Sequence, residues 1–321
     1  MSINPLIHIG YHKTGTTWLQ NDLFVHGNSI FEPFSLEKSG HSSIARHFVW
    51  DVKNYREKGY MLSPFDMNEP IIKDKISEIF KNKDFTGKIP VISSERLSGP
   101  PYAGGYDAKT IASRLKFHFP KAKILIVIRE QTSMLLSMYL QYLYIGGFQS
   151  ISKFLKTKYD GRLPTFSPNH FIYNHLINDY QQNFGADNVL ILPYEMFKDY
   201  PTKFFEYLSD FVGKEIRVSL SLNNKYNTSN EKYIYYVTRY LNLLSFSSSV
   251  NAYSPLVRKP FRKFVNTIRK FYLPILTEKK VKRIRSKLLY EISENFTDVY
   301  REHNKKLSTL INIDLKDYGY Y

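Results

Sequence analysis

The sequence predicts an α/β fold of three layers, with a central parallel sheet between helices and a helical C-terminal extension. Short runs of branched apolar residues alternate with segments that are apolar at helical spacing, from about residue 5 to residue 211. The run 124–128 is continuously apolar, as in a parallel strand that is buried on both faces. The first run leads through a loop rich in glycine and threonine into a helix-like pattern, so the predicted fold is P-loop-like.

The loop after the first strand, residues 10–17, predicts a site for an anion such as phosphate. Its glycines, lysine and threonines lie where exposed backbone N–H groups and the positive end of a helix favour negative charge. A P-loop for nucleoside triphosphates has its lysine directly after the second glycine. Here Thr16 occupies that position, and Lys13 precedes Gly15 by two residues. The displaced lysine argues against ATP chemistry. The alternative to an anion site is a turn that needs its glycines for geometry alone.

The segment 30–88 is expected to be an irregular excursion between the first two strands. Turns that contain proline are expected at 31–34, 62–65 and 68–70, and helices around 41–54 and 71–82. A long excursion of this kind either carries binding loops or covers the sheet.

Three more strands are expected at 88–96, 122–128 and 189–195, with helices at 111–119, 130–144, 170–184 and 203–211. Ligands of open parallel sheets bind at the carboxyl ends of the strands. Lys13, Glu95 and Arg129 each follow the end of a different strand, so we expect them to converge although they are far apart in sequence.

The 321 residues are expected to form a single domain, with an α/β core at 1–212 and a helical, basic part at 213–321. A helix is expected at 231–244, followed by two helices broken near Pro274. The stretch 258–287 holds twelve Lys or Arg and one acidic residue, which is +11 of the formal net charge of +16. An acidic partner is therefore expected at this stretch.

Composition excludes several classes of protein. A hydrophobic content of 43% allows a sizeable core, and the absence of cysteine excludes disulfides and thiolate chemistry. The N-terminus has no positive region followed by an apolar stretch, and no apolar run approaches the length that crosses a bilayer. A cytoplasmic protein is the expectation.

Two motifs resemble those of the sulfotransferases that use 3′-phosphoadenosine 5′-phosphosulfate (PAPS). Residues 11–19, YHKTGTTWL, are similar to the 5′-phosphosulfate loop of that family. Residues 124–130, ILIVIRE, with Ser137 eight residues after Arg129, resemble its 3′-phosphate site. The two motifs in this order are specific, whereas either alone is weaker.

Two further segments add to the resemblance, which covers residues 5–211 and, more weakly, the C-terminus. Tyr194-Glu195, followed by Pro201 and an apolar helix, looks like another recurring segment of the family. The ending at 314–320, DLKDYGY, is similar to that of bacterial carbohydrate (glycan) sulfotransferases.

The resemblance implies that PAPS is the donor and adenosine 3′,5′-bisphosphate the product. The donor carries a 5′-phosphosulfate and a separate 3′-phosphate, so it needs two anion sites at a fixed distance. An arginine fork and a hydroxyl suit the second site. Trp18 would stack on the adenine as the family's tryptophan does, with packing against the sheet as the alternative. The implied donor-binding residues are Lys13, Thr14, Gly15, Thr16, Thr17, Trp18, Arg129 and Ser137.

The implied reaction is in-line transfer, in which the protein mainly supplies position and charge stabilisation. Lys13 would stabilise the leaving phosphate, and His12 would bind a sulfuryl oxygen or the acceptor. Glu95 resembles the catalytic glutamate of glycan sulfotransferases and is the candidate general base. The alternative for Glu95 is an ion pair with Arg96 or Arg129. No metal is expected.

The acceptor is expected to be a hydroxyl or amine of a carbohydrate or glycolipid. An acidic acceptor would suit the basic charge of the protein. The basic stretch 258–287 would hold such a glycan or rest on anionic lipid at the inner face of the membrane. Alternatives are a sulfotransferase for a lipid or small molecule and a P-loop nucleotide kinase. A nucleic-acid-binding protein would explain the charge but not the paired anion motifs, so no nucleic acid is expected as a partner.

Overall fold

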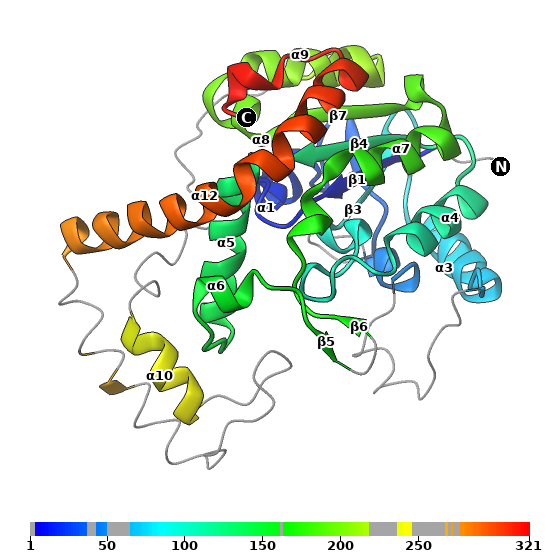
Figure 1. Ribbon diagram of the computed structural model, residues 1–321. Coiled ribbons are helices and arrows are strands. Elements are labelled where there is room, and N and C mark those ends of the chain that lie inside the picture. The colour runs from blue at the N-terminus through cyan, green and yellow to red at the C-terminus, as the bar shows by residue number, and fades with distance from the viewer. Residues whose placement is uncertain are drawn as a thin grey trace.

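The residues described in the computed structural model include a five-stranded parallel sheet (Figure 1). The structure describes residues 4–36, 43–49, 65–160, 163–217, 236–245, 267–268, 271 and 277–321. The strands are β1 (Leu6–Gly10), β2 (Phe31–Pro33), β3 (Ile89–Ser93), β4 (Lys123–Ile128) and β7 (Val189–Pro193). The predicted α/β fold with a central parallel sheet is confirmed.

The order of the strands in space, β2-β3-β1-β4-β7, reverses at β1. The chain passes from β1 to one side of the sheet and later returns across it to β4 and β7. Leu6 accordingly lies opposite Val91 of β3 and Lys123 of β4. Since crossovers between parallel strands are right-handed, such a reversal places helices on both faces, and ligand sites lie where the order reverses. The loop that follows β1 begins at this point.

The helices pack on the sheet and on one another. α4 packs against α7, which contacts β4 and β7, while α9 contacts α8 and β7, and α12 packs against α5 and α7. The helical segments are α1 (Thr16–Trp18), the π-type turn η1 (Leu19–Leu23), α3 (Glu69–Asn82), α4 (Ala108–His118), α5 (Gln131–Tyr144), α6 (Ile151–Phe154), α7 (Tyr173–Phe184), α8 (Tyr194–Asp199), α9 (Pro201–Val212), α10 (Tyr236–Ser245) and α12 (Glu278–Ile311). A short antiparallel pair joins β5 (Tyr159–Asp160) to β6 (Leu163–Pro164).

Local features of the chain explain where several predicted elements begin or end. The Glu130 carboxylate accepts hydrogen bonds from the backbone N–H groups of Thr132 and Ser133, so α5 begins at residue 131. Pro168 starts a separate 3₁₀ turn, η5 (Pro168–Phe171), so α7 begins at residue 173 rather than 170. The strand expected at 189–195 ends at residue 193, because Tyr194 already starts α8.

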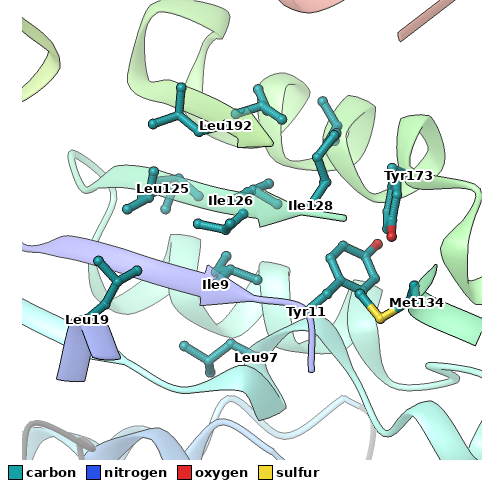
Figure 2. Close-up of a cluster of buried hydrophobic side chains, with 14 of the residues drawn as sticks. Ile9, Tyr11, Leu19, Leu97, Leu125, Ile126, Ile128, Met134, Tyr173 and Leu192 are labelled. Carbon is teal, nitrogen blue, oxygen red and sulfur yellow. The ribbon is translucent and has the colours of Figure 1, made fainter. Parts of the chain in front are cut away.

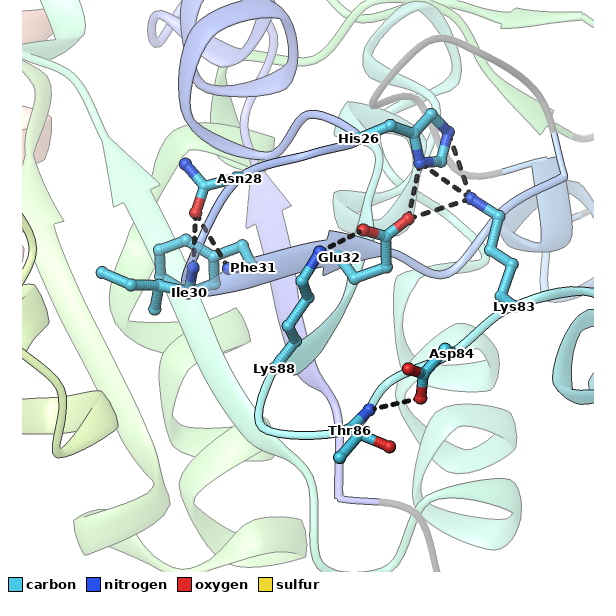
Figure 3. Close-up of polar contacts among 9 residues, drawn as sticks. All are labelled: His26, Asn28, Ile30, Phe31, Glu32, Lys83, Asp84, Thr86 and Lys88. Atoms are coloured by element: carbon cyan, nitrogen blue, oxygen red, sulfur yellow. Dashed lines mark hydrogen bonds and ion pairs between the residues drawn. The ribbon is translucent and has the colours of Figure 1, made fainter.

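The turn expected at 31–34 is wrong, because residues 31–33 form the edge strand β2. Phe31 is fully buried, and Pro33 is tolerated because β2 pairs with a neighbour on one side only. Figure 3 shows Glu32 of β2 between two lysines and a histidine. Its carboxylate oxygens lie 3.2 Å from Lys83 Nζ, 3.3 Å from Lys88 Nζ and 2.6 Å from His26 Nδ1. This cluster fastens the edge strand to the segment before β3.

The C-terminal part contains a longer continuous helix, α12, than the sequence predicts. α12 begins after the N-cap Thr277, continues to residue 311 and contains neither proline nor glycine. It therefore runs well past the basic stretch for which helices are expected. The break expected near Pro274 lies outside the described residues, as does half of the helix expected at 41–54. Within the described half, residues 43–47 form a 3₁₀ turn, η2 (Ser43–His47).

The core lies along β1 and β4, where Figure 2 shows Ile9, Ile126 and Ile128 packed together. Residues 124–128 are all fully buried, as their apolar run predicts. At the carboxyl end of β1, Tyr11 packs against Tyr173 of α7, with 4.8 Å between the ring centroids. Among the described residues, no helix is long and apolar enough to cross a membrane.

Candidate functional site

The loops that follow β1, β3 and β4 meet at the carboxyl edge of the sheet. The backbone N–H of Tyr11 donates to Val127 O at 3.4 Å, and that of Ser94 donates to His8 O at 3.3 Å. The structure thereby brings together Lys13, Glu95 and Arg129, one from each loop. Their charges act on one another, since both Arg129 and Glu95 shift the pKa of Lys13.

The loop after β1 has the backbone geometry of an anion-binding turn. Lys13 has φ 67° and Gly15 has φ 79°, both in the left-handed region. A left-handed residue in a turn directs successive N–H groups toward one point, which is how backbone nests bind anions. Gly10 is required for space, because a Cβ there would lie 2.4 Å from Thr16 Oγ1.

The threonines of this loop differ in what they contact. The Thr14 hydroxyl donates to Tyr11 O at 2.6 Å and lies 3.5 Å from Thr16 Oγ1, and both side chains are buried. Thr17 is half-buried. The hydroxyls of Thr14 and Thr16 therefore help to shape the loop from inside.

Trp18, the last residue of α1, lies mostly inside the protein. Its side chain is 9% exposed, and its ring lies 5.1 Å from the Phe197 ring and 5.9 Å from the Phe205 ring, between centroids. Trp18 thus joins the loop after β1 to α8 and α9. A contact with adenine remains a prediction.

Arg129 is held on two sides at the end of β4. Its Nη1 donates to the carbonyl oxygen of Lys13 at 2.9 Å, and its Cζ lies 5.1 Å from the centroid of the Tyr194 ring. Its Nε is buried and has no hydrogen-bond partner. A buried donor without an acceptor costs free energy, so this nitrogen is suited to meet an anionic oxygen.

Lys13 reaches across to α5, a contact that sequence reasoning missed. Its Nζ donates to Gln141 Oε1 at 2.8 Å. Burial lowers the pKa of Lys13, the positive charge of Arg129 lowers it further, and Glu95 acts in the opposite direction. Ser137, which is half-buried, precedes Gln141 by four residues and so lies on the same face of α5. That spacing is the signal by which Gln141 can be recognised.

Glu95 and His12 lie beside each other in the same region. Glu95 begins the 3₁₀ turn η3 (Glu95–Ser98), which Ser94 caps by accepting the N–H of Arg96. Burial lowers the pKa of His12 to about 4, with Arg96 and Lys13 acting in the same direction and Glu95 in the opposite one. His12 is therefore neutral at pH 7, and its buried Nδ1 has no hydrogen-bond partner.

His170 of η5 is a second imidazole in this region that sequence reasoning missed. Its ring centroid lies 5.1 Å from that of Tyr11. Burial lowers the pKa of His170 to about 3, and the neighbouring His12 adds to this effect. Only the fold brings residues 12 and 170 together, so the sequence carries no signal for this pair.

Metal ligands do not cluster in the part of the chain that the structure describes. No group of three or more His, Asp or Glu side chains there is arranged to hold a metal ion.

No family model matches the sequence, and no curated protein matches it. Among solved structures, a sulfotransferase from Alicyclobacillus acidocaldarius is similar at a TM-score of 0.54 and 14% sequence identity, over 99% of each chain. A sulfotransferase domain from the curacin biosynthetic pathway matches at a TM-score of 0.44 and 15% identity, over 90% of this chain and 98% of the other. The mouse sulfotransferase SULT7A1 complexed with PAP matches at 0.36 and 16%, over 94% and 88%. The first of these similarities shows a sulfotransferase-like fold along the full chain.

Proposed function

We propose that this protein is an enzyme that transfers a sulfuryl group from PAPS to a hydroxyl or amine of a carbohydrate. The observation that carries the proposal is the hydrogen bond from Arg129 Nη1 to the carbonyl oxygen of Lys13. It joins the two elements proposed to bind the two anionic ends of the donor. A donor with two anionic groups at a fixed separation needs two sites held rigidly relative to each other.

The proposed donor site uses the loop after β1 for the 5′-phosphosulfate and Arg129 with Ser137 for the 3′-phosphate. The left-handed backbone at Lys13 and Gly15 supports the first assignment. The buried Nε of Arg129 supports the second, because a guanidinium pairs well with phosphate oxygens. Trp18 is proposed to contact the adenine with the small part of its ring that is exposed.

In the proposed mechanism the protein positions the reacting groups and stabilises charge. Lys13 would neutralise the charge that develops on the leaving phosphate, and its lowered pKa makes it a better proton donor to that oxygen. Glu95 would take the proton of the acceptor. His12, which burial keeps neutral, would hydrogen-bond to a sulfuryl oxygen or to the acceptor. The mechanism requires no metal ion.

An acidic carbohydrate or glycolipid is the proposed acceptor class, with α12 as part of its binding surface. Figure 1 shows the N-terminal half of α12 extending away from the sheet. Lys279, Lys280, Lys282, Arg283 and Lys287 are exposed on this half. A basic surface of this kind attracts an anionic glycan or the headgroups of anionic lipid at the inner face of a membrane.

Binding of adenosine 3′,5′-bisphosphate tests the donor assignment. In a thermal-shift comparison, we expect the bisphosphate to raise the melting temperature and ATP to leave it unchanged. Stabilisation by ATP alone would favour the nucleotide-kinase alternative. A labelled-sulfate transfer assay over a panel of glycans, lipids and small molecules then identifies the acceptor, and transfer to none of the glycans would contradict the carbohydrate proposal.

Vesicle sedimentation tests the membrane contact. We expect co-sedimentation with vesicles that contain anionic lipid and none with neutral vesicles. Reversal of charge at Lys279, Lys280 and Arg283 should abolish it. Sedimentation that does not depend on anionic lipid would contradict the assignment to the basic surface of α12.

A further inference from the structure

The peptide group between Arg129 and Glu130 is held from both sides. The hydroxyl of Tyr173 donates to the carbonyl oxygen of Arg129 at 2.6 Å. On the other side, the N–H of Glu130 donates to Glu195 Oε1 at 3.2 Å. Since neither end of this peptide group is free to rotate, the direction in which the Arg129 side chain leaves the backbone is fixed.

Glu195 is in turn held by the C-terminal segment. The hydroxyl of Tyr320 donates to Glu195 Oε2 at 3.1 Å. Tyr320 is 1% exposed, and its N–H donates to Leu315 O at 3.1 Å. The residue before it, Gly319, has φ 82°, a left-handed conformation that favours glycine and that turns the chain toward Glu195.

A second connection joins the same segment to the start of α5. The main-chain oxygen of Tyr321 accepts a hydrogen bond from Asn304 Nδ2 at 3.0 Å. Asn304 and Gln131 exchange two hydrogen bonds, of 2.7 and 3.1 Å. Gln131 is the first residue of α5 and lies two positions after Arg129. The C-terminal segment therefore braces the turn around Arg129 at two points.

The neighbouring Tyr194 supports the guanidinium itself. Ile128 of β4 lies opposite Pro193 of β7, so the residues that follow these strands are adjacent. This register places the Tyr194 ring 5.1 Å from Arg129 Cζ. Tyr194 thus orients the head of the arginine, while Glu195 orients its backbone.

We infer that Glu195 and Tyr320 are positioning residues, which fix Arg129 in the orientation that recognises the 3′-phosphate of the donor. The inference rests on the proposed function, because it assumes that Arg129 binds this phosphate. It gives a role to two segments of the sequence, 194–195 and 314–320, that the proposed chemistry does not use.

A purely structural role for the same contacts makes a different prediction. If Tyr320 only satisfied a buried carboxylate, its loss would lower stability and would affect all nucleotide ligands alike. If it positions Arg129, its loss weakens the contact with the 3′-phosphate in particular. The distinction lies in the ratio of affinities for a ligand with and without that phosphate.

The experiment measures binding of adenosine 3′,5′-bisphosphate and of AMP by calorimetry to the wild type, Tyr320→Phe and Tyr139→Phe. Tyr139 is the control, since its side chain is buried like that of Tyr320 and its hydroxyl likewise donates a hydrogen bond, here to the backbone carbonyl of Gln149 at 3.0 Å. We expect Tyr320→Phe to weaken binding of the bisphosphate about three- to tenfold and to leave AMP binding unchanged. Tyr139→Phe should change neither affinity.

Glu195→Gln provides the conservative variant, because its amide keeps a carbonyl oxygen for the N–H of Glu130. It should retain more of the affinity for the bisphosphate than Glu195→Ala. Equal weakening of both ligands by Tyr320→Phe, or no weakening of either, overturns the inference. A wild type that binds both ligands equally shows instead that no 3′-phosphate site exists, and the proposed function then fails together with the inference.

Discussion

Lys13 Nζ donates a hydrogen bond to Gln141 Oε1 at 2.8 Å, so the lysine of the loop after β1 is held by a residue on α5 that follows it by 128 positions. Its backbone carbonyl meanwhile accepts the hydrogen bond from Arg129. The partner of the ammonium group is a neutral amide and not a carboxylate. An amide holds the lysine in place more weakly than a charged group does, so the lysine can transfer its hydrogen bond to a developing negative charge.

Gln141→Glu should therefore slow the reaction. A carboxylate at this position would bind the ammonium group by a charge-assisted hydrogen bond, about twice as strong as a neutral one, and would keep it from the leaving oxygen. We expect kcat to fall about tenfold, which corresponds to about 1.4 kcal/mol, with little change in the KM for the donor. Gln141→Ala, which frees the lysine, serves as the control and should stay within about threefold of the wild type. Equal kcat values for Gln141→Glu and the wild type would contradict this role of Lys13.

Glu95→Gln should remove transfer and leave binding of the bisphosphate product intact. The substitution keeps the size of the side chain but removes its basicity, and general-base catalysis typically contributes about 10²- to 10⁴-fold in rate. Single-turnover rates and calorimetric affinities measure the two effects separately. Glu206→Gln on α9, an exposed carboxylate, is the control for loss of one negative charge. Turnover retained in Glu95→Gln would assign the base to another group.

Arg129→Lys tests the arginine fork without loss of charge. A lysine cannot donate the paired hydrogen bonds of a guanidinium, and it also loses the hydrogen bond to the carbonyl of Lys13. We expect the affinity for adenosine 3′,5′-bisphosphate to fall roughly tenfold or more, with a smaller loss in Ser137→Ala. AMP, which lacks the 3′-phosphate, is the control ligand. An equal loss of affinity for AMP would contradict the assignment of Arg129 to that phosphate.

The sequence predicts those parts of the fold whose signal is local. The continuous apolar run of β4, the helical periodicity of α5 and α7, and the glycines of the loop after β1 are all visible within a few residues. The edge strand β2 is missed because three residues that include Pro33 resemble a turn. Only the pairing with β3 and the ion cluster around Glu32 make it a strand.

The candidate site is predicted as a set of strand-end residues, but not as a network. Lys13, Glu95 and Arg129 are expected to converge because parallel strands end at one edge of the sheet. The contacts of Lys13 with Gln141 and of Glu195 with Tyr320 join residues more than a hundred positions apart. A single sequence does not reveal which of such distant positions are in contact, because the contact depends on how α5 and the C-terminal segment pack.

The free energy of unfolding should decrease as the pH falls below about 6.5, because the protein interior keeps three histidines neutral in the folded state. Burial lowers the pKa of His8 to about 4, of His12 to about 4 and of His170 to about 3. Well above pH 6.5 these imidazoles are neutral in both the folded and the unfolded state and add no pH dependence. Between about pH 6.5 and 4 the unfolded state binds protons that the folded state does not, so the free energy of unfolding decreases as the pH falls. Each histidine contributes about 1.4 kcal/mol per pH unit in this window.

The contribution of one histidine can be isolated by substitution. His170→Gln removes one of the three groups and leaves every other titrating group in place. The difference in the free energy of unfolding between wild type and variant is measured by urea denaturation from about pH 4.5 to about pH 8. We expect this difference to change by about 1.4 kcal/mol per pH unit below about pH 6 and to be constant above about pH 7. His175→Gln, at an exposed position on α7, is the control for replacement of a histidine by glutamine. Parallel curves for wild type and His170→Gln would show that His170 titrates alike in both states, and that its burial does not keep it neutral.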